Sequence, residues 1–250
     1  MSTPFTTNIS DGIAEMILDH PPVNAFDSAG WFAIADEIDA LGVNDDVRVI
    51  VIAAAGKGFC AGVDIKELAA DSSKIVDVNK GNYETFRAIH RNPKPVIVAL
   101  HSFVLGGGIG MAGAADIILC SDCARFGVPE IDRGAMGGGA HLQRMFPVQK
   151  VRYMYFTGEC IDAQEAYRLG AVERVVPLEK LLPTAREIAE KIAEKSPAMV
   201  KLAKEALTGI EDGNLEDKYR WEQGFTLEAY TMGDSQESRD AFVQKRDAEF

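Results

Sequence analysis

The most restrictive feature of this sequence is a long uncharged stretch that runs from Pro95 to Ala115. Its length raises the question of a membrane helix, but it contains five glycines, and His101 and Ser102 lie in its middle. Each glycine costs a helix about 1 kcal/mol relative to alanine. A buried strand at Val96–Leu100 followed by a tightly packed turn therefore explains the stretch better than a membrane span does.

Other apolar segments have the pattern of strands. Val47–Ala53 is a continuous run rich in valine and isoleucine, which is typical of a strand buried on both faces. Ile13–Leu18 and Asp116–Cys120 are further predicted strands, and segments with helical spacing separate them. This alternation predicts an α/β layered core. From Leu178 onward the spacing of apolar residues is helical only, so we expect an all-helical last third.

The composition excludes several classes of function. Hydrophobic residues make up 47% of the 250 residues, which is enough for a sizeable core. The net charge is −12, so the surface repels nucleic-acid phosphates and anionic lipid, and we expect neither partner. The first basic residue is Arg48, which predicts no targeting peptide and a cytoplasmic protein. Cys120 and Cys123 form a C-x-x-C without a second ligand pair, so we predict no metal site.

Three segments have the composition of ligand-binding turns. In Phe59–Glu67, small residues let a backbone N–H approach a ligand oxygen, although an ordinary strand-to-helix turn has the same composition. In Gly106–Met111, glycines lead into a short helix whose first N–H groups suit an anionic oxygen. In Phe126–Glu130, the carboxylate has apolar neighbours and is suited to proton transfer. A surface glutamate paired with a nearby arginine is the alternative for Glu130.

The second segment also contains a G-x-G-x-x-G pattern at Gly108, Gly110 and Gly113. Such a pattern occurs in dinucleotide-binding folds, where a helix crosses between two parallel strands. Here the next predicted strand begins near Asp116, which leaves about two helical turns, whereas a parallel crossover needs a dozen or more residues. We therefore reject a dinucleotide site, since the pattern alone is weak evidence.

Taken together and in this order, the three segments resemble the crotonase (enoyl-CoA hydratase/isomerase) superfamily. The resemblance also covers Asn24-Ala25, 167–172 and 240–246, and so spans nearly the whole chain. It implies an α/β fold with a crotonase-like spiral of ββα units over residues 1–195. It also implies a helical C-terminal trimerisation region over residues 196–250, in a homotrimer or homohexamer. The implied substrate is an acyl-CoA, with coenzyme A as part of the substrate and no prosthetic group.

The resemblance also implies roles for individual residues. Members of the family hold the thioester oxygen with two backbone N–H groups, which correspond here to Val63 and Gly107. They bind the CoA adenine near the same turn, at the positions of Ala61 and Val63. Lysines close to that turn and to the tail contact the CoA phosphates. The corresponding residues here are Lys57, Lys66 and Lys245.

One position departs from the family pattern. Hydratases of the family use two glutamates around one water, and these correspond to Gly110 and Glu130. Glycine cannot move a proton, which argues against two-glutamate hydration and leaves a one-glutamate hydratase or double-bond isomerase as an alternative. The dienoyl isomerases require an acidic residue at the position of Gly138, so we exclude them. A non-catalytic CoA-binding protein is a further alternative, which the intact Gly107 and Glu130 oppose.

Finer features resemble the CoA-thioester ring hydrolases of bacterial steroid-ring degradation. These features are Gly62–Glu67, Gly106–Gly110, Glu130–Ala135, His141-Leu142, Tyr219 and 222–226. Such enzymes add water to a ring ketone and open the ring by retro-Claisen cleavage. Glu130 is the first candidate for the base and His141 the second, although His141 fits a capping or core-edge histidine equally well. Asp64, which we expect to cap a helix, and Glu222, which we expect at a subunit interface, are weaker candidates.

Overall fold

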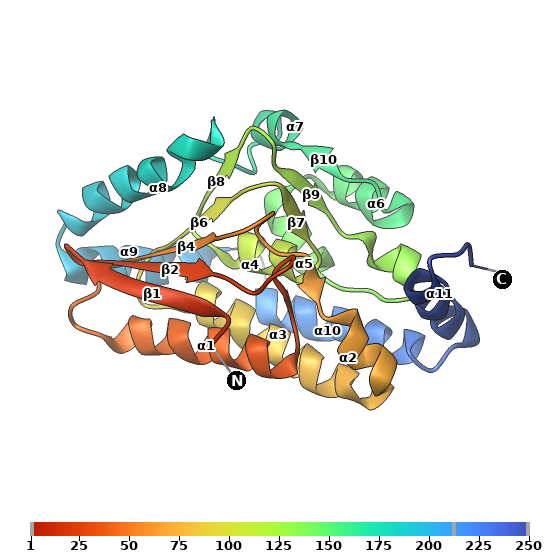
Figure 1. Ribbon diagram of the computed structural model, residues 1–250. Coiled ribbons are helices and arrows are strands. Elements are labelled where there is room, and N and C mark those ends of the chain that lie inside the picture. Colours follow the sequence, from red (N-terminus) through yellow and green to blue (C-terminus); the bar gives the residue numbers. More distant parts are fainter. Residues whose placement is uncertain (1–2, 212–213, 249–250) are drawn as a thin grey trace.

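The computed structural model describes residues 3–211 and 214–248, which form an α/β core surrounded by helices (Figure 1). The main sheet has six strands in the order β1-β2-β4-β6-β8-β11. Strands β1 and β2 are antiparallel, and the other neighbours are parallel. The six strands are β1 (Phe5–Ser10), β2 (Ile13–Leu18), β4 (Val49–Ala54), β6 (Val96–Leu100), β8 (Ile117–Ser121) and β11 (Arg174–Val176).

Two small sheets lie beside the main sheet. One has the order β10-β9-β7, and the other pairs β3 with β5 in parallel. Their strands are β3 (Ala25–Phe26), β5 (Gly62–Val63), β7 (Phe103–Leu105), β9 (Arg125–Gly127) and β10 (Ile161–Asp162). The helices of the core are α1 (Ser28–Val43), α2 (Ile65–Ala70), η1 (Ser72–Lys74), α3 (Ile75–His90), α4 (Gly107–Ala114), η2 (Pro129–Arg133), α5 (Gly139–Met145), α6 (Val148–Thr157), α7 (Ala163–Arg168) and α8 (Leu178–Ala193).

The apolar strand β4 is buried on both faces, as its sequence predicts. Val49, Val51 and Ala53 face α8, which covers one side of the main sheet. Ile50 and Ile52 belong to the core on the other side, which α1, α3 and α4 cover. Because side chains alternate along a strand, an uninterrupted apolar run is what two covered faces require.

Strand β1 was missing from the sequence prediction. Its six residues, FTTNIS, are all exposed or half-buried, because β1 lies at the edge of the sheet with a single neighbour. The polar residues of this strand hide the alternation on which the prediction depended. The predicted strands at 13–18, 47–53, 96–100 and 116–120 are confirmed to within two residues.

The last part of the chain is helical, as predicted. It contains α9 (Pro197–Ile210), α10 (Leu215–Ala229) and α11 (Gly233–Gln244). Helix α10 packs along α3 and α5, and α11 contacts η2 at the opposite end of the molecule from α8 (Figure 1). The division at residue 195 and the trimerisation role of the tail stay predictions. Among the described residues, no helix is long and apolar enough to cross a bilayer.

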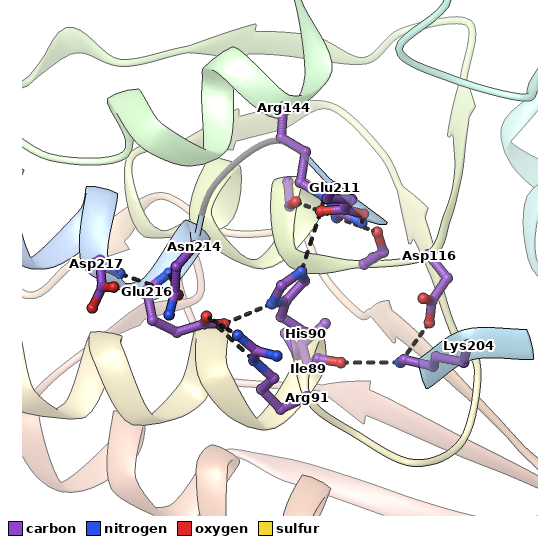
Figure 2. A network of polar contacts seen from close by, with 12 residues as sticks. Ile89, His90, Arg91, Asp116, Arg144, Lys204, Glu211, Asn214, Glu216 and Asp217 are labelled. Carbon is purple, nitrogen blue, oxygen red and sulfur yellow. Dashed lines mark hydrogen bonds and ion pairs between the residues drawn. The ribbon is translucent and has the colours of Figure 1, made fainter. Parts of the chain in front are cut away.

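A partly buried polar network fastens Glu211, directly after α9, and Glu216, near the start of α10, to the core (Figure 2). His90, at the end of α3, contacts Glu216 through Nδ1 at 2.6 Å and Glu211 through Nε2 at 3.4 Å. Arg91 also donates to Glu216, and Arg144 donates to Glu211. These contacts fix where α10 begins, and therefore how α10 lies over the core.

Candidate active site

Two backbone segments from different parts of the chain meet at the N-terminus of α4. A Cβ on Gly62, in β5, would lie 3.4 Å from the backbone nitrogen of Gly107. Gly62 has φ +93° and Gly106 has φ +52°, a region that favours glycine. The sequence therefore brings the first two predicted ligand-binding turns into contact.

The backbone amides of Val63 and Gly107 are the available donors at this contact. Asp64 N–H donates to Phe26 O at 2.8 Å, and successive N–H groups of a strand point in opposite directions, so Val63 N–H points away from β3. Gly107 is the first residue of α4, so its N–H has no acceptor within the helix. Val63 and Gly107 line one cavity. Two such donors have the arrangement of an oxyanion hole, in which each donor typically contributes about 3 kcal/mol to the stabilisation of a transition state.

The ring of Trp31 supports Gly107 from behind. Trp31 is fully buried, and a Cβ on Gly107 would lie 2.6 Å from its Cη2 and Cζ2 atoms. Any larger residue at 107 would displace either the indole or the amide. The third glycine of the triplet, Gly108, packs equally closely on Cys60 O, at 2.9 Å from an added Cβ. The glycine triplet is thus a requirement of packing as well as of the donor geometry.

Glu130 adds a carboxylate to the same place. Pro129 is the first residue of η2, and its fixed φ sets the backbone just before Glu130. Oε1 of Glu130 lies against Gly106, where an added Cβ would overlap it. Glu130 is half-buried and lines the cavity with Val63 and Gly107. The structure thus brings the three predicted turns to one site, with one carboxylate beside two amide donors.

The cavity itself is small, about 50 Å³ in volume. Apolar side chains of α2 and α3 form one wall. Tyr219 and Thr226 of α10 close another, together with Tyr230 directly after this helix. Thr226 fastens α10 to the loop before α5 by donating to Met136 O at 2.5 Å. Helix α10 is therefore held directly over the cavity.

Two asparagines of α3, Asn79 and Asn82, also line this cavity, and neither is among the site residues predicted from sequence. They lie in the mixed polar segment between residues 65 and 92, where neither had a distinguishing motif. The available signal was their spacing with Phe86 and His90, at steps of three, four and four residues, which places all four on one stripe of α3.

Phe86 occupies the space beside Gly110. A Cβ on Gly110 would overlap the Phe86 ring at Cζ and Cε2 and would lie 2.6 Å from Cε1. Phe86 is buried and packs edge-on against Trp31. The place where the family's hydratases carry their first glutamate is therefore filled by an aromatic ring, so the site has an apolar wall there.

His141 lies behind this wall. Its ring packs edge-on against Phe86 and Tyr219, with ring centroids 4.8 and 4.9 Å away, and it is 2% exposed. It is not among the residues that line the cavity, and its Nδ1 makes no hydrogen bond within the described residues. Burial lowers the pKa of His141 to about 3, so the imidazole is neutral at pH 7. This position agrees with a core-edge histidine, and a catalytic role stays a prediction.

The remaining predicted residues lie around the site. Asp64 caps α2, since its side chain accepts from Lys66 N at 2.9 Å. Ala61 is half-buried and directly precedes β5. The three lysines predicted to contact CoA are exposed: Lys57, Lys66 and Lys245. The side chain of Glu222 lies outside the described part of the structure.

The cysteines have no metal-binding arrangement. Cys120 is buried and Cys123 is exposed, and both are free thiols. Burial raises the pKa of the Cys60 thiol to about 12, so this residue beside β5 is not a thiolate nucleophile. Within residues 3–211 and 214–248, no cluster of three metal-ligating side chains is found.

Two amide donors and one carboxylate in a small, mostly apolar cavity define an enzyme that stabilises the oxyanion of a bound carbonyl compound. Comparison with known families specifies that compound. The chain belongs to the enoyl-CoA hydratase/isomerase family, whose sequence profile matches residues 8–250. It is therefore an enzyme that acts on CoA thioesters, with the crotonase fold.

Individual relatives agree with this assignment. A (7aS)-7a-methyl-1,5-dioxo-2,3,5,6,7,7a-hexahydro-1H-indene-carboxyl-CoA hydrolase of Rhodococcus jostii is 46% identical over 241 residues, covering 96% of this chain and 93% of its own. The enzyme of the same name from Mycobacterium tuberculosis is 41% identical and covers 96% and 98%. A crystal structure of an enoyl-CoA hydratase/isomerase from Xanthobacter autotrophicus matches with a TM-score of 0.90 at 24% identity, covering 100% and 99%.

Proposed function

We propose that this enzyme opens the ring of a cyclic ketone CoA thioester by hydrolysis. The observation that carries the proposal is the combination of Glu130 beside the Val63 and Gly107 amides with Phe86 in the place of a second carboxylate. Such a site has one proton carrier, one oxyanion hole and an apolar wall. The names of the two hydrolases support the choice, since each specifies a bicyclic skeleton with two oxo groups and a carboxyl-CoA.

The reaction begins with water attack on the ring ketone. Glu130 accepts one proton as the water oxygen bonds to the ketone carbon. The neighbouring ring C–C bond then breaks, and its electron pair is delocalised onto the thioester oxygen as an enolate. The Val63 and Gly107 amides hold this oxygen, and they stabilise the enolate more than the neutral thioester. Glu130 returns its proton to the enolate carbon, which leaves a ring-opened carboxylic acid.

Hydration or double-bond isomerisation of a straight-chain acyl-CoA is the alternative, because one glutamate and an oxyanion hole serve an isomerase as well. The two readings differ in substrate. A ring-opening enzyme turns over a bicyclic ketone CoA thioester and leaves crotonyl-CoA unchanged. Efficient hydration of crotonyl-CoA by the wild type would contradict our proposal.

The decisive variant is Glu130→Gln. It keeps the shape of the side chain but cannot accept a proton, so we expect kcat to fall by about 10² to 10⁴. The Kd for a CoA thioester, measured by calorimetry, is expected to stay within about threefold. Glu179→Gln, on the exposed surface of α8, serves as the control and should behave as the wild type. Unchanged kcat in Glu130→Gln would remove Glu130 from the mechanism.

We propose further that exposed lysines hold the CoA phosphates and that the region 196–250 assembles a homotrimer, or a hexamer of two trimers. Exposed apolar side chains on α9 support the assembly: Met199, Leu202, Leu207 and Ile210. Light scattering on the purified protein tests the assembly, since a monomer at micromolar concentration would contradict it.

The role of the lysines has its own test. Charge reversal of Lys57 and Lys66 should weaken the binding of CoA and leave the binding of a truncated pantetheine thioester unchanged.

A further inference from the structure

The active-site cavity contains polar atoms that the proposed chemistry does not use. Oδ1 of Asn82 and Nδ2 of Asn79 are both buried, and neither has a hydrogen-bond partner among the described residues. Asn82 is only 6% exposed, and both residues line the cavity with Glu130 and Gly107. An unpaired buried amide group costs about 1–3 kcal/mol, so two of them in one small space require an explanation.

Structural roles do not explain the two amides. Asn92, at the far end of the same segment, shows what a structural asparagine does in this protein. Its Nδ2 donates to Ile38 O at 2.9 Å, and its Oδ1 accepts from Lys94 N at 3.0 Å. Asn24 likewise donates to Ala55 O and Gly58 O and accepts from His20 N. Asn79 and Asn82 instead line the cavity that the substrate enters.

We propose that Asn79 and Asn82 form a subsite that hydrogen-bonds an oxo group on the ring of the acyl moiety. This inference rests on the proposed function and names the feature by which the enzyme selects its substrate. The rest of the wall that α2 and α3 provide is apolar, with Leu68, Val78 and Phe86. That wall suits a hydrocarbon ring, and the two amides provide the donors and acceptors for an oxygen on it.

The chemistry of ring opening gives such a subsite a purpose. Only one ring carbonyl is attacked by water, so a second ring oxygen keeps its lone pairs throughout the reaction. Burying that oxygen without a donor would cost binding free energy, whereas an amide N–H offsets the loss. A site built to hydrogen-bond an oxygen rejects the analogue that lacks it, because its own buried amides then stay unpaired.

A matched pair of thioesters tests the subsite. We would measure the Kd of 4-oxocyclohexanecarboxyl-CoA and of cyclohexanecarboxyl-CoA by calorimetry. Cleavage of a C–C bond beside the ketone of the first compound would leave an electron pair on a carbon that is not next to the thioester carbonyl. No enolate can then form, so the ring stays closed and binding is measured without turnover. We expect the wild type to bind the oxo compound about tenfold more tightly.

The variant Asn79→Leu/Asn82→Leu should lose this preference, with a ratio of Kd values near one. Its Kd for cyclohexanecarboxyl-CoA should stay within about threefold of the wild type. Asn8→Leu, on the exposed side of β1, is the control and should keep the tenfold ratio. If the double variant does not fold, the single variants Asn79→Ala and Asn82→Ala decide, since at least one should reduce the ratio by threefold or more.

The outcomes separate the two proposals. A wild type that binds both thioesters equally, or variants that keep the tenfold ratio, would overturn the oxo subsite and leave ring hydrolysis standing. A wild type that binds the oxo compound preferentially but does not open a bicyclic ketone thioester would overturn the proposed reaction and leave the subsite standing. A wild type that binds neither CoA compound would overturn both.

Discussion

Polar side chains at the two ends of one stripe of α3 differ in their pairing: those at the C-terminal end have hydrogen-bond partners, and those at the other end have unpaired atoms. At the C-terminal end, His90 is 4% exposed and contacts Glu216 and Glu211, while Arg91 donates to Glu216 (Figure 2). Lys204, close by, donates to Asp116 at 2.7 Å and to two backbone carbonyls. Two to three turns away on the same stripe, Asn82 is buried and Asn79 is half-buried, and each has a buried polar atom without a partner among the described residues.

The difference separates the structural part of the stripe from the part that binds ligand. Most buried polar groups that stabilise the fold have their partners within the protein, because an unpaired buried group costs free energy on folding. Polar groups that recognise a ligand retain an unpaired donor or acceptor until the ligand binds. Phe86 lies between the two ends and fills the place of the missing glutamate, so it divides the paired network from the cavity.

Removal of a carboxylate from the paired end should give the largest loss of stability. Glu216→Ala removes the common partner of buried His90 and half-exposed Arg91, and the loss of a hydrogen-bonded carboxylate that leaves a buried partner unpaired costs about 3 kcal/mol. Urea unfolding followed by circular dichroism measures the free energy. Glu179→Ala, on the exposed surface of α8, is the control and should match the wild type. Equal stability of the two variants would contradict a structural role for the network.

Acid should lower the stability of the protein in two separate pH windows. Burial lowers the pKa of His141 to about 3, below its unfolded value of 6.5, so the stability from neutral His141 is lost as the pH falls below 6.5. Burial alone would raise the pKa of Glu216, but hydrogen bonds from His90 and Arg91 lower it to about 2. The stability that Glu216 contributes is therefore complete above its unfolded value of 4.5 and is lost only below it.

Between pH 6.5 and 4.5 the free energy of unfolding should consequently fall by up to about 1.4 kcal/mol per pH unit because of His141. The measurement is urea unfolding at four pH values from 7.5 to 4.5. His141→Phe keeps an aromatic ring between Phe86 and Tyr219 and should flatten this window. A decline that persists unchanged in His141→Phe would assign the acid sensitivity to other groups.

A glutamate at position 110 should not restore a second acid/base group by itself. Gly110→Glu would place a side chain where the Phe86 ring already lies, and overpacking of a core costs about 1–3 kcal/mol. Gly110→Glu/Phe86→Ala removes that clash, and it should recover part of the stability and admit the carboxylate to the site. Thermal unfolding and turnover of crotonyl-CoA are the measurements. A stable single variant would show that Phe86 is free to move aside.

Much of the site was predictable from sequence because its parts are local. The Phe59–Glu67 turn, the glycine triplet and the Pro129-Glu130 pair each have a backbone requirement that the residue types reveal. The apolar wall was not predictable, because Phe86 contacts Gly110 from another helix and no sequence pattern around either residue indicates this contact. Asn79 and Asn82 were missed for a related reason: a buried asparagine and a surface asparagine look alike until the packing shows which polar atoms have partners.

The smallest expected effect on stability tests most directly whether the cavity end of the α3 stripe differs from its paired end. Asn82→Leu removes a buried oxygen that has no partner among the described residues, so the free energy of unfolding should change by less than about 0.5 kcal/mol or even rise. Asn92→Leu is its match on the same chain segment, is equally buried, and should cost about 2–3 kcal/mol because Ile38 O and Lys94 N lose their partner. If the two variants lose the same stability, Asn82 is a structural residue and the cavity end of α3 does not differ from the paired end.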